Sequence, residues 1–301
     1  MDNVCHTLVG AAVAQAGFKQ RTALATATAA IAANLPDIDV LVFATDIPSV
    51  AFRRGITHGA PAQLLLPIAC AAIMYAVGRR RASPAGPGVH FGWLLTLSYI
   101  GIFTHVFLDF LNTYGIRLLS PVSQTWFYGD AVFIVDPWLW LILGTGWFMA
   151  RRRGPRAAGL ALAAAALYIS VMLVSAQLAR GIVEDAWIAR GGQSARALMV
   201  GPVPITPLRK SIIVDAGDHY VEGTFSWFPT RVAFGDVTPK NDDVARISAA
   251  REDPEVAGIL VWSRFPYWEI RPVPSGTEVR VRDMRFKGLD RGGFTASTVV
   301  R

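Results

Sequence analysis

The stretch "GIFTHVFLDFLNTYG", residues 101–115, is apolar enough for a membrane helix, yet it contains His105 and Asp109. Residues four positions apart lie on the same face of a helix. An imidazole and a carboxylate buried in such surroundings cost free energy unless other groups satisfy them. We therefore expect polar or ionic partners for both side chains. A structural ion pair, a proton relay and a metal site would each supply them.

Two other histidines and two aspartates occur in related positions along the chain. His6 in "CHT" and His58 in "THG" each lie near the end of an apolar segment, and "NLPDIDV" places Asp37 and Asp39 just beyond another. Nitrogen and oxygen ligands of this kind suit zinc, manganese or iron, and there are enough of them for one or two ions. We interpret the set as a divalent metal site, with zinc as the first choice. Its candidate ligands are His6, Asp37, Asp39, His58, His105 and Asp109.

Several of these aspartates also have an ordinary structural interpretation. Asp37 and Asp39 could be residues at a helix end, and Asp136 directly before Pro137 has the pattern of a helix N-cap. Asp130 follows Gly129 and could be a turn residue. In the metal-site interpretation Asp130 and Asp136 are the candidate catalytic residues, which orient the reacting water or a ligating imidazole.

The elements that must position these residues are predicted to be membrane-spanning helices. Of the 301 residues, 52% are hydrophobic, which is high for a soluble enzyme. A helix needs about 20 apolar residues to cross a bilayer. The sequence predicts four such helices, at residues 60–78, 91–111, 132–150 and 157–179. Two shorter Ala-rich stretches, at about 7–18 and 22–35, are predicted to form a helical hairpin packed among them.

Basic residues predict the orientation of these helices. They gather at alternate turns, which the positive-inside rule places in the cytoplasm: Lys19 with Arg21, residues 79–81 and residues 151–156. The candidate ligands then lie at the outer side of the membrane. Three arginines run against this scheme, namely Arg53, Arg54 and Arg117. Since no basic patch is interleaved with aromatic residues, we expect no nucleic-acid partner.

The composition changes after about residue 180. Residues 1–180 hold 13 Lys/Arg, 7 Asp and no Glu, whereas residues 181–301 hold 16 Lys/Arg and 15 Asp/Glu. The alternation in "RKSIIVDAGDHYVEGTFSW" predicts a β-hairpin, "TEVRVRDMRF" predicts a further strand, and a helix is expected at about 241–251. The predicted fold class is therefore α+β. A polytopic transmembrane helical bundle (residues 1–180) carries the metal site, and a small soluble antiparallel β-rich domain (residues 181–301) follows on the outer face.

The order and spacing of several segments resemble the YdjM-like membrane-bound metal-dependent hydrolases, which are also described as LexA-binding and inner membrane-associated. The matching segments are "MDNVCHTLVGAAVA", "NLPDIDVL", "RRGITHG", "FTHVFLDFLNTYG" and "SPVSQTWFYGDAVFIVDPW". The resemblance implies a multi-pass protein of the bacterial inner membrane, with a periplasmic or extracellular C-terminal domain. It also implies that the six candidate ligands form a polar metal centre, with Asp130 and Asp136 as neighbours. Cys5 precedes His6 where a threonine is typical of the family.

A looser similarity suggests the reaction. The pattern His105-x-x-x-Asp109 with an upstream Asp and His resembles zinc-dependent phospholipase C and related single-strand nucleases, which indicates phosphoester hydrolysis. We therefore predict an integral-membrane metal-dependent hydrolase that acts on a phosphoester or similar bond of a lipid-linked substrate, with membrane lipids as its surroundings. The alternative is a non-enzymatic membrane protein whose structural ion site supports an anchoring or regulatory role toward a protein partner, as the LexA-binding description implies.

Overall fold

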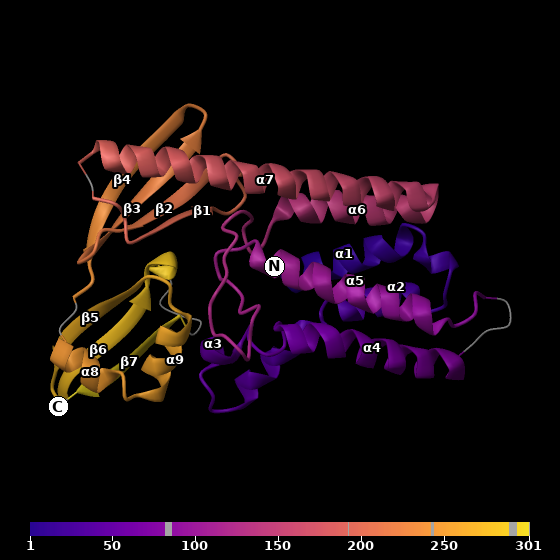
Figure 1. The fold of residues 1–301 in the computed structure, drawn as a ribbon, viewed down its shortest axis with the longest axis horizontal. Helices are drawn as coiled ribbons and strands as arrows, with labels where there is room; N and C mark the ends of the chain where they lie inside the picture. Colours follow the sequence, from indigo (N-terminus) through magenta and orange to yellow (C-terminus); the bar gives the residue numbers. More distant parts are fainter. Residues whose placement is uncertain (82–85, 192, 242–243, 289–293, 301) are drawn as a thin grey trace. The chain divides into compact units, whose positions relative to one another are not determined.

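The computed structural model describes residues 1–81, 86–191, 193–241, 244–288 and 294–300 (Figure 1). It confirms a mixed α+β chain, helical in its N-terminal part and with antiparallel sheets in its C-terminal part. The chain divides into two compact units, which we describe separately. The helical unit comprises residues 1–39 and 54–175, and the C-terminal unit comprises residues 40–53 and 176–301.

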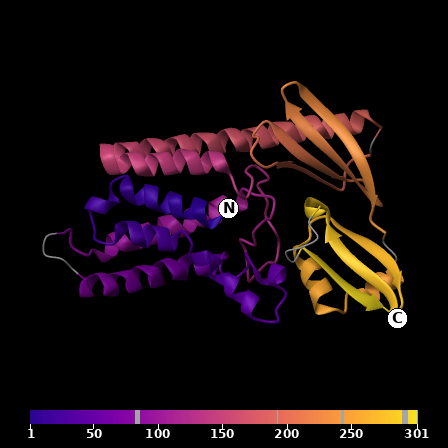
Figure 2. The ribbon, with the colours of Figure 1, turned by 180° about the vertical axis from the view of Figure 1, so that it is seen from behind.

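The helical unit consists of helices that lie side by side, as both ribbon views show (Figures 1 and 2). Its helices are α1 (Asn3–Gln15), α2 (Ala25–Ala32), α4 (Ala60–Arg80), α5 (Phe91–Phe110), α6 (Pro137–Arg153) and the first part of α7 (Pro155–Ala189). Two 3₁₀ segments, η1 (Phe18–Gln20) and η2 (Leu35–Ala44), follow α1 and α2. The chain therefore returns several times to the end of the unit at which His6, Asp37, His58 and His105 lie.

Among the described residues, three helices are long and apolar enough to cross a membrane, namely α4, α5 and α7. The pair α2 and η2, which is bent by 52°, would give a fourth. The span expected at 132–150 is instead α6, which begins at Pro137 and ends in three arginines. The prediction of helix at 132–136 was wrong, because the Asp136 side chain caps α6 and Pro137 occupies its first turn.

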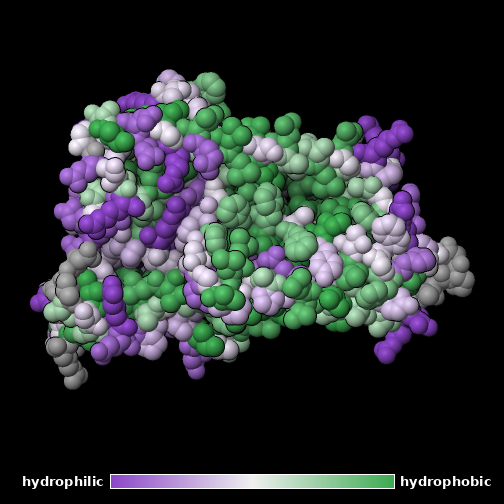
Figure 3. All heavy atoms as spheres, in the orientation of Figure 1, coloured by the Kyte–Doolittle hydropathy of each residue, from purple (hydrophilic) through white to green (hydrophobic). Residues whose placement is uncertain are grey.

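Hydrophobic side chains cover much of the helical unit (Figure 3). Large apolar residues of α4 and α7 are exposed, among them Leu65 (66%), Ile73 (63%), Leu160 (72%) and Leu167 (67%). The hydrophilic side chains of this unit gather at the end where α4 and α6 finish in their arginine-rich turns (Figure 3). This distribution is typical of helices whose outer surface contacts lipid.

Small residues bring α2 and α5 into close contact. A Cβ atom at Gly101 of α5 would lie 2.8 Å from the Ala32 Cβ and 2.9 Å from the Ala33 backbone nitrogen. Glycine therefore allows the two backbones to approach closely. Small residues have the same effect at interfaces between membrane helices. The same contact holds the end of α2 beside His105, one turn further along α5.

The C-terminal unit contains two antiparallel sheets. The first has the order β1 (Ala197–Pro202), β2 (Arg209–Asp215), β3 (His219–Trp227) and β4 (Thr230–Pro239). The second has the order β5 (Pro266–Val273), β6 (Gly276–Asp283) and β7 (Thr295–Val300). The predicted hairpin (β2 and β3) and the predicted strand (β6) are therefore confirmed. Of the helix expected at 241–251, residues 244–250 form α8 (Val244–Ala250), and residues 242–243 lie outside the described residues.

One segment from the first part of the chain packs within the C-terminal unit. Residues 40–53 include α3 (Ser49–Phe52), which lies against α9 (Pro254–Trp262). Gly258 of α9 is in such close contact with this segment that a Cβ atom there would lie 2.3 Å from the Pro48 Cβ. The residues directly before and after this segment, Asp39 and Arg54, belong to the helical unit and to the polar centre described next.

Candidate metal centre

Helix α5 supplies two members of the polar centre. His105 and Asp109 are completely buried, and the His105 Nε2 lies 3.5 Å from the Asp109 Oδ2. Their spacing of four residues places them on one face of the helix, as the sequence predicts. On an apolar helix face each group loses its hydration, so both need partners that replace the lost water.

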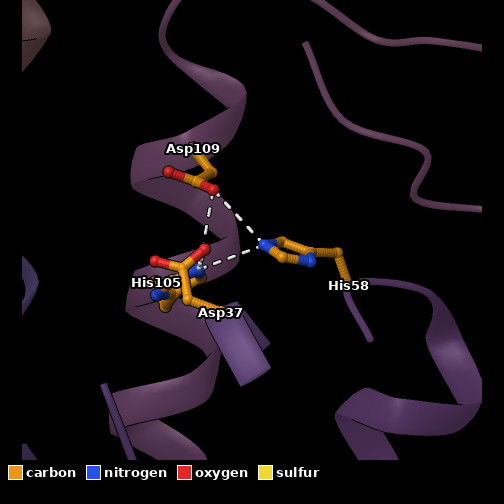
Figure 4. Close-up of side chains that lie close together, drawn as sticks. All are labelled: Asp37, His58, His105 and Asp109. Carbon is orange, nitrogen blue, oxygen red and sulfur yellow. Dashed lines mark hydrogen bonds and ion pairs between the residues drawn. The ribbon is translucent and has the colours of Figure 1, made fainter. Parts of the chain in front are cut away.

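Two further residues converge on this pair from other elements (Figure 4). His58 lies in the turn before α4, and its Nε2 is 3.1 Å from the His105 Nε2 and 3.3 Å from the Asp109 Oδ2. Asp37 lies on η2, and its Oδ1 is 3.9 Å from the His105 Nε2. One ligand atom from each of Asp37, His58, His105 and Asp109 lies within 4.8 Å of the others, and all four residues are buried. We call these four residues the metal-site group.

The hydrogen-bond partner of His105 sets the tautomer of its ring. The His105 Nδ1 lies 2.7 Å from the Ala33 carbonyl oxygen, which can only accept a hydrogen bond. Nδ1 therefore carries a proton. In the neutral ring Nε2 then presents a lone pair to the metal-site group.

The same reasoning applies to His58 through a short chain of hydrogen bonds. The Thr57 hydroxyl donates to the Asp39 Oδ2 at 3.2 Å, so its oxygen is left to accept from the His58 Nδ1 at 3.0 Å. In the neutral His58 ring Nε2 is therefore also unprotonated. When both rings are neutral, the two imidazoles thus direct lone pairs toward each other across 3.1 Å.

A cation between the two Nε2 atoms would relieve this repulsion. Zinc holds four tetrahedral ligands at about 2.0–2.2 Å, which separates the ligand atoms by roughly 3.3–3.6 Å. The separations from His58 and His105 to Asp109, 3.3 Å and 3.5 Å, lie within this range, whereas the two imidazole nitrogens are closer, at 3.1 Å, and Asp37 is farther from His105, at 3.9 Å. Two imidazoles and two carboxylates are also a ligand set used for zinc, manganese and iron. The group therefore fits a divalent metal ion by its chemistry and by the distances between its ligand atoms.

Two other candidate ligands lie beside the metal-site group and contact its members. The His6 ring stacks on His105 with centroids 3.9 Å apart, and its Nε2 lies 3.3 Å from the Asp109 Oδ1. The Met1 backbone amine also contacts Asp109. Asp39 accepts hydrogen bonds from Thr57 and from the Arg54 backbone nitrogen, and its Oδ2 lies 3.6 Å from the His58 Nδ1. In this structure Asp39 therefore fixes the ring of His58 from the side away from the group.

Arg54 was not among the candidates named from the sequence. It is buried, and its Nε lies 3.0 Å from the Asp109 Oδ2 while a terminal nitrogen donates to the Asp109 Oδ1 at 3.2 Å. Its guanidinium also donates to Asn112 and to the Gly115 carbonyl oxygen. The sequence contained a signal for this role, because an arginine at the side predicted to be the outer one runs against the positive-inside rule.

The two candidate catalytic aspartates lie outside the metal-site group. The Asp136 Oδ1 accepts from the Trp138 and Leu139 backbone nitrogens, both at 3.0 Å, and its Oδ2 accepts from the Tyr168 hydroxyl at 2.9 Å. It is thus the N-cap of α6, the alternative that its position before Pro137 suggested. Asp130 is buried in a turn with a positive φ of 49°.

Comparisons with known proteins place the chain in a family. The model of a family described as YdjM inner membrane protein matches residues 1–179, which include all the members of the metal-site group. The uncharacterized protein YfhP of Bacillus subtilis (strain 168) is 25% identical over 269 residues, covering 87% of this chain and 77% of that protein. No solved structure matches the chain. The family match confirms the resemblance drawn from the sequence segments.

Proposed function

Because the chain belongs to the YdjM family of inner membrane proteins, we propose that its buried group is the metal centre of an integral-membrane hydrolase. The reaction we propose is attack of an activated water on a phosphoester or similar bond of a membrane-associated, lipid-linked substrate. The observation that carries the proposal is the buried group in which the Nε2 atoms of two imidazoles lie 3.1 Å apart beside two carboxylates.

A bound divalent ion would lower the pKa of a water from 15.7 to about 7 and polarise the bond to be cleaved. The residues that would hold it are Asp37, His58, His105 and Asp109. Zinc is the metal we favour, with manganese or iron as alternatives, and the neighbouring His6 and Asp39 are close enough to the group that we retain them as candidate ligands of a second ion.

The remaining residues orient the ligands. Arg54 holds both oxygens of Asp109, the Ala33 carbonyl oxygen fixes His105, and Asp39 with Thr57 fixes His58. Outer partners of this kind set which nitrogen of a ring faces the metal and how the carboxylate is turned. We retain Asp130 as a candidate for orienting the water, whereas Asp136 would act only through the N-terminus of α6.

Complete burial of the group favours a second candidate function. His58, His105 and Asp109 are 0% exposed, and a structural ion that is fully enclosed by protein ligands needs no access for substrate. In that case the chain is a non-enzymatic membrane protein that anchors or regulates a protein partner. The two candidates differ in whether one coordination position stays open to water.

The experiment that tests the proposal is metal analysis followed by a substrate screen. Full-length protein purified in detergent without chelators is analysed for zinc, manganese and iron by elemental mass spectrometry. The same sample is then assayed for hydrolysis of phospholipids and polyprenyl phosphates. Stoichiometric metal with chelator-sensitive hydrolysis supports the enzyme, and stoichiometric metal without hydrolysis supports the structural ion site. Absence of metal would contradict both the hydrolase and the structural ion site.

We further propose that the metal-site end of the helical unit and the C-terminal unit face the periplasm or the extracellular side. The basis is the arginine-rich turns after α4 and α6, which mark the cytoplasmic end. Single cysteines at Ser226 and at Gln20 of a cysteine-free background, labelled by a membrane-impermeant maleimide in intact spheroplasts, test this topology. Labelling at residue 226 but not at residue 20, which lies in the basic turn after α1, is expected, and the reverse would contradict the assignment.

A further inference from the structure

The first sheet of the C-terminal unit has an end at which two connections come together. Since β1 to β4 are antiparallel neighbours, the β1–β2 connection (residues 203–208) and the β3–β4 turn (residues 228–229) lie at the same end. The Trp227 backbone nitrogen donates to the Leu208 carbonyl oxygen at 3.0 Å and joins them. We call this the loop end of the sheet.

A basic groove with a volume of about 640 Å³ lies at the loop end. Arg209, Ser226 and Arg231 line it from β2, β3 and β4, and the strand register places them directly opposite one another in a row. Thr206 and Thr224 add two hydroxyl groups to the lining. Lys210, which is fully buried, also contributes to the lining, and no described acidic side chain does.

The chemistry of this lining is that of a phosphate site. Arginine presents a planar fork of N–H donors that matches two phosphate oxygens, and the hydroxyl groups of serine and threonine donate to a third. Two arginines that flank a serine across three strands offer these donors to one anion. A cationic ligand or a neutral one would leave the charges unpaired.

Large apolar side chains project beside the groove. Phe228 lies in the β3–β4 turn and is 80% exposed, and Ile205 and Leu208 of the β1–β2 connection are 69% and 47% exposed. Phe228 is itself part of the groove lining. Exposed apolar residues next to basic ones are typical of surfaces that enter the headgroup region of a membrane.

We propose that the loop end binds the phosphate of an anionic membrane lipid, with Arg209 and Arg231 on the phosphate and Phe228 with Ile205 among the acyl chains. A free phosphate would be recognised by the same arginines, but it would gain nothing from the apolar side chains. The presence of both features at one end of the sheet therefore favours the lipid. The inference stands independently of the proposed metal centre, because none of these residues belongs to that centre.

The test measures lipid binding to the full-length protein in detergent by native mass spectrometry, with phosphatidylglycerol as the anionic probe and phosphatidylcholine as the zwitterionic one. Arg209→Gln with Arg231→Gln should weaken phosphatidylglycerol binding about a hundredfold, roughly tenfold for each of the two charge-assisted contacts that are lost. Arg246→Gln with Arg251→Gln removes the same charge at and beside α8 and should leave it unchanged. Equal weakening in both double variants, or none in either, would overturn the proposal.

A second variant separates the lipid from a free anion. Phe228→Ser keeps both arginines and should weaken phosphatidylglycerol binding. Inorganic phosphate should displace the lipid from this variant at least as readily as from the wild type. If inorganic phosphate binds the wild type as tightly as the lipid does and Phe228→Ser changes neither, the groove is a site for a soluble anion and the lipid assignment is wrong. Near-ultraviolet circular dichroism confirms that each variant is folded.

Discussion

The imidazoles of His58 and His105 face each other through their Nε2 atoms at 3.1 Å, while each ring donates its Nδ1 proton to a partner on the far side. This relationship joins the turn before α4 to the C-terminal part of α5. Two neutral rings in this arrangement need a proton or a metal ion between them, and the predictions on the metal centre follow from the second case.

Replacement of either histidine should remove the metal. His105→Ala removes one of the four proposed ligands. We expect metal affinity to fall by more than the roughly 10–100-fold that follows the loss of a residue hydrogen-bonded to a ligand. Elemental mass spectrometry of protein purified in parallel with the wild type measures the effect. His90→Ala, an exposed position at the start of the same helix, is the matched control and should retain the metal. Full metal content in His105→Ala would exclude this residue as a ligand.

Arg54 should matter most when the metal is absent. In Arg54→Gln the buried Asp109 loses its guanidinium partner, and breaking a buried ion pair costs about 3–5 kcal/mol. A divalent ion on Asp109 would replace part of that lost charge, so added metal should raise the thermal unfolding temperature of Arg54→Gln more than that of the wild type. Arg53→Gln, whose side chain lies over the Phe43 ring, is the neighbouring control. An equal metal response in Arg54→Gln and the wild type would mean that Arg54 does not share Asp109 with the ion.

Close packing of α5 on α2 should be necessary for the metal centre. A valine at Gly101 would collide with Ala32 and the Ala33 backbone, so it should push away the carbonyl group that fixes the His105 ring. We expect Gly101→Val to lose stability by several kcal/mol, in the range of overpacked cores, and to lose metal with it. Gly92→Val on the same helix enters open space and should bind metal normally. Thermal unfolding and metal content of the two variants are measured in parallel. Normal metal content in Gly101→Val would show that this close packing is not necessary for the metal centre.

The segment 40–53 should transmit changes in the C-terminal unit to the metal centre. Gly258→Val would displace Pro48, and the segment that holds Pro48 lies between Asp39 and Arg54. We expect metal affinity to fall by about 10–100-fold, as for the loss of an outer partner of a ligand. Gly181→Val in the same unit has no neighbour within 4 Å of the added Cβ and serves as the control. Normal metal affinity in Gly258→Val, despite altered proteolysis of residues 40–53, would contradict the coupling.

Asp283 should make the C-terminal unit sensitive to acid. Burial by itself raises the pKa of this carboxyl, but the charge and hydrogen bonds of Arg285 and the hydroxyl of Ser263 outweigh it and hold the pKa below its usual range. A carboxyl with a depressed pKa in the folded state stabilises above its unfolded value of about 3.9, and this contribution disappears as the pH falls through the lower folded value.

The stability of this unit should therefore be flat from neutral pH to about pH 5 and decline below it. Asp283→Ala should lower stability at neutral pH by about 3–5 kcal/mol and flatten the decline in acid. Urea unfolding across this pH range, monitored by hydrogen exchange of the β5 and β6 amides, measures both effects. Asp236→Asn, which changes an exposed carboxyl of β4, should change neither. An unchanged acid profile in Asp283→Ala would show that another group is responsible.

The sequence by itself determined the features that depend on local patterns. The length of α5, observed at 91–110 against an expected 91–111, follows from the thickness of a bilayer, and the placement of His105 and Asp109 on one face follows from the helical period. The hairpin of β2 and β3 follows from alternation with a period of two.

Only the tertiary structure decided which side chains meet. Asp37 joins the metal-site group while Asp39, two residues later, holds His58 from outside it, because neighbouring side chains on a tight helical segment point in different directions. Arg54 reaches Asp109 from 55 residues away in sequence, and residues 40–53 pack in the C-terminal unit. Such contacts depend on how closely one backbone can approach another, as Gly101 allows for α5 and α2, and this distance is a property of packed pairs of elements and not of any one segment.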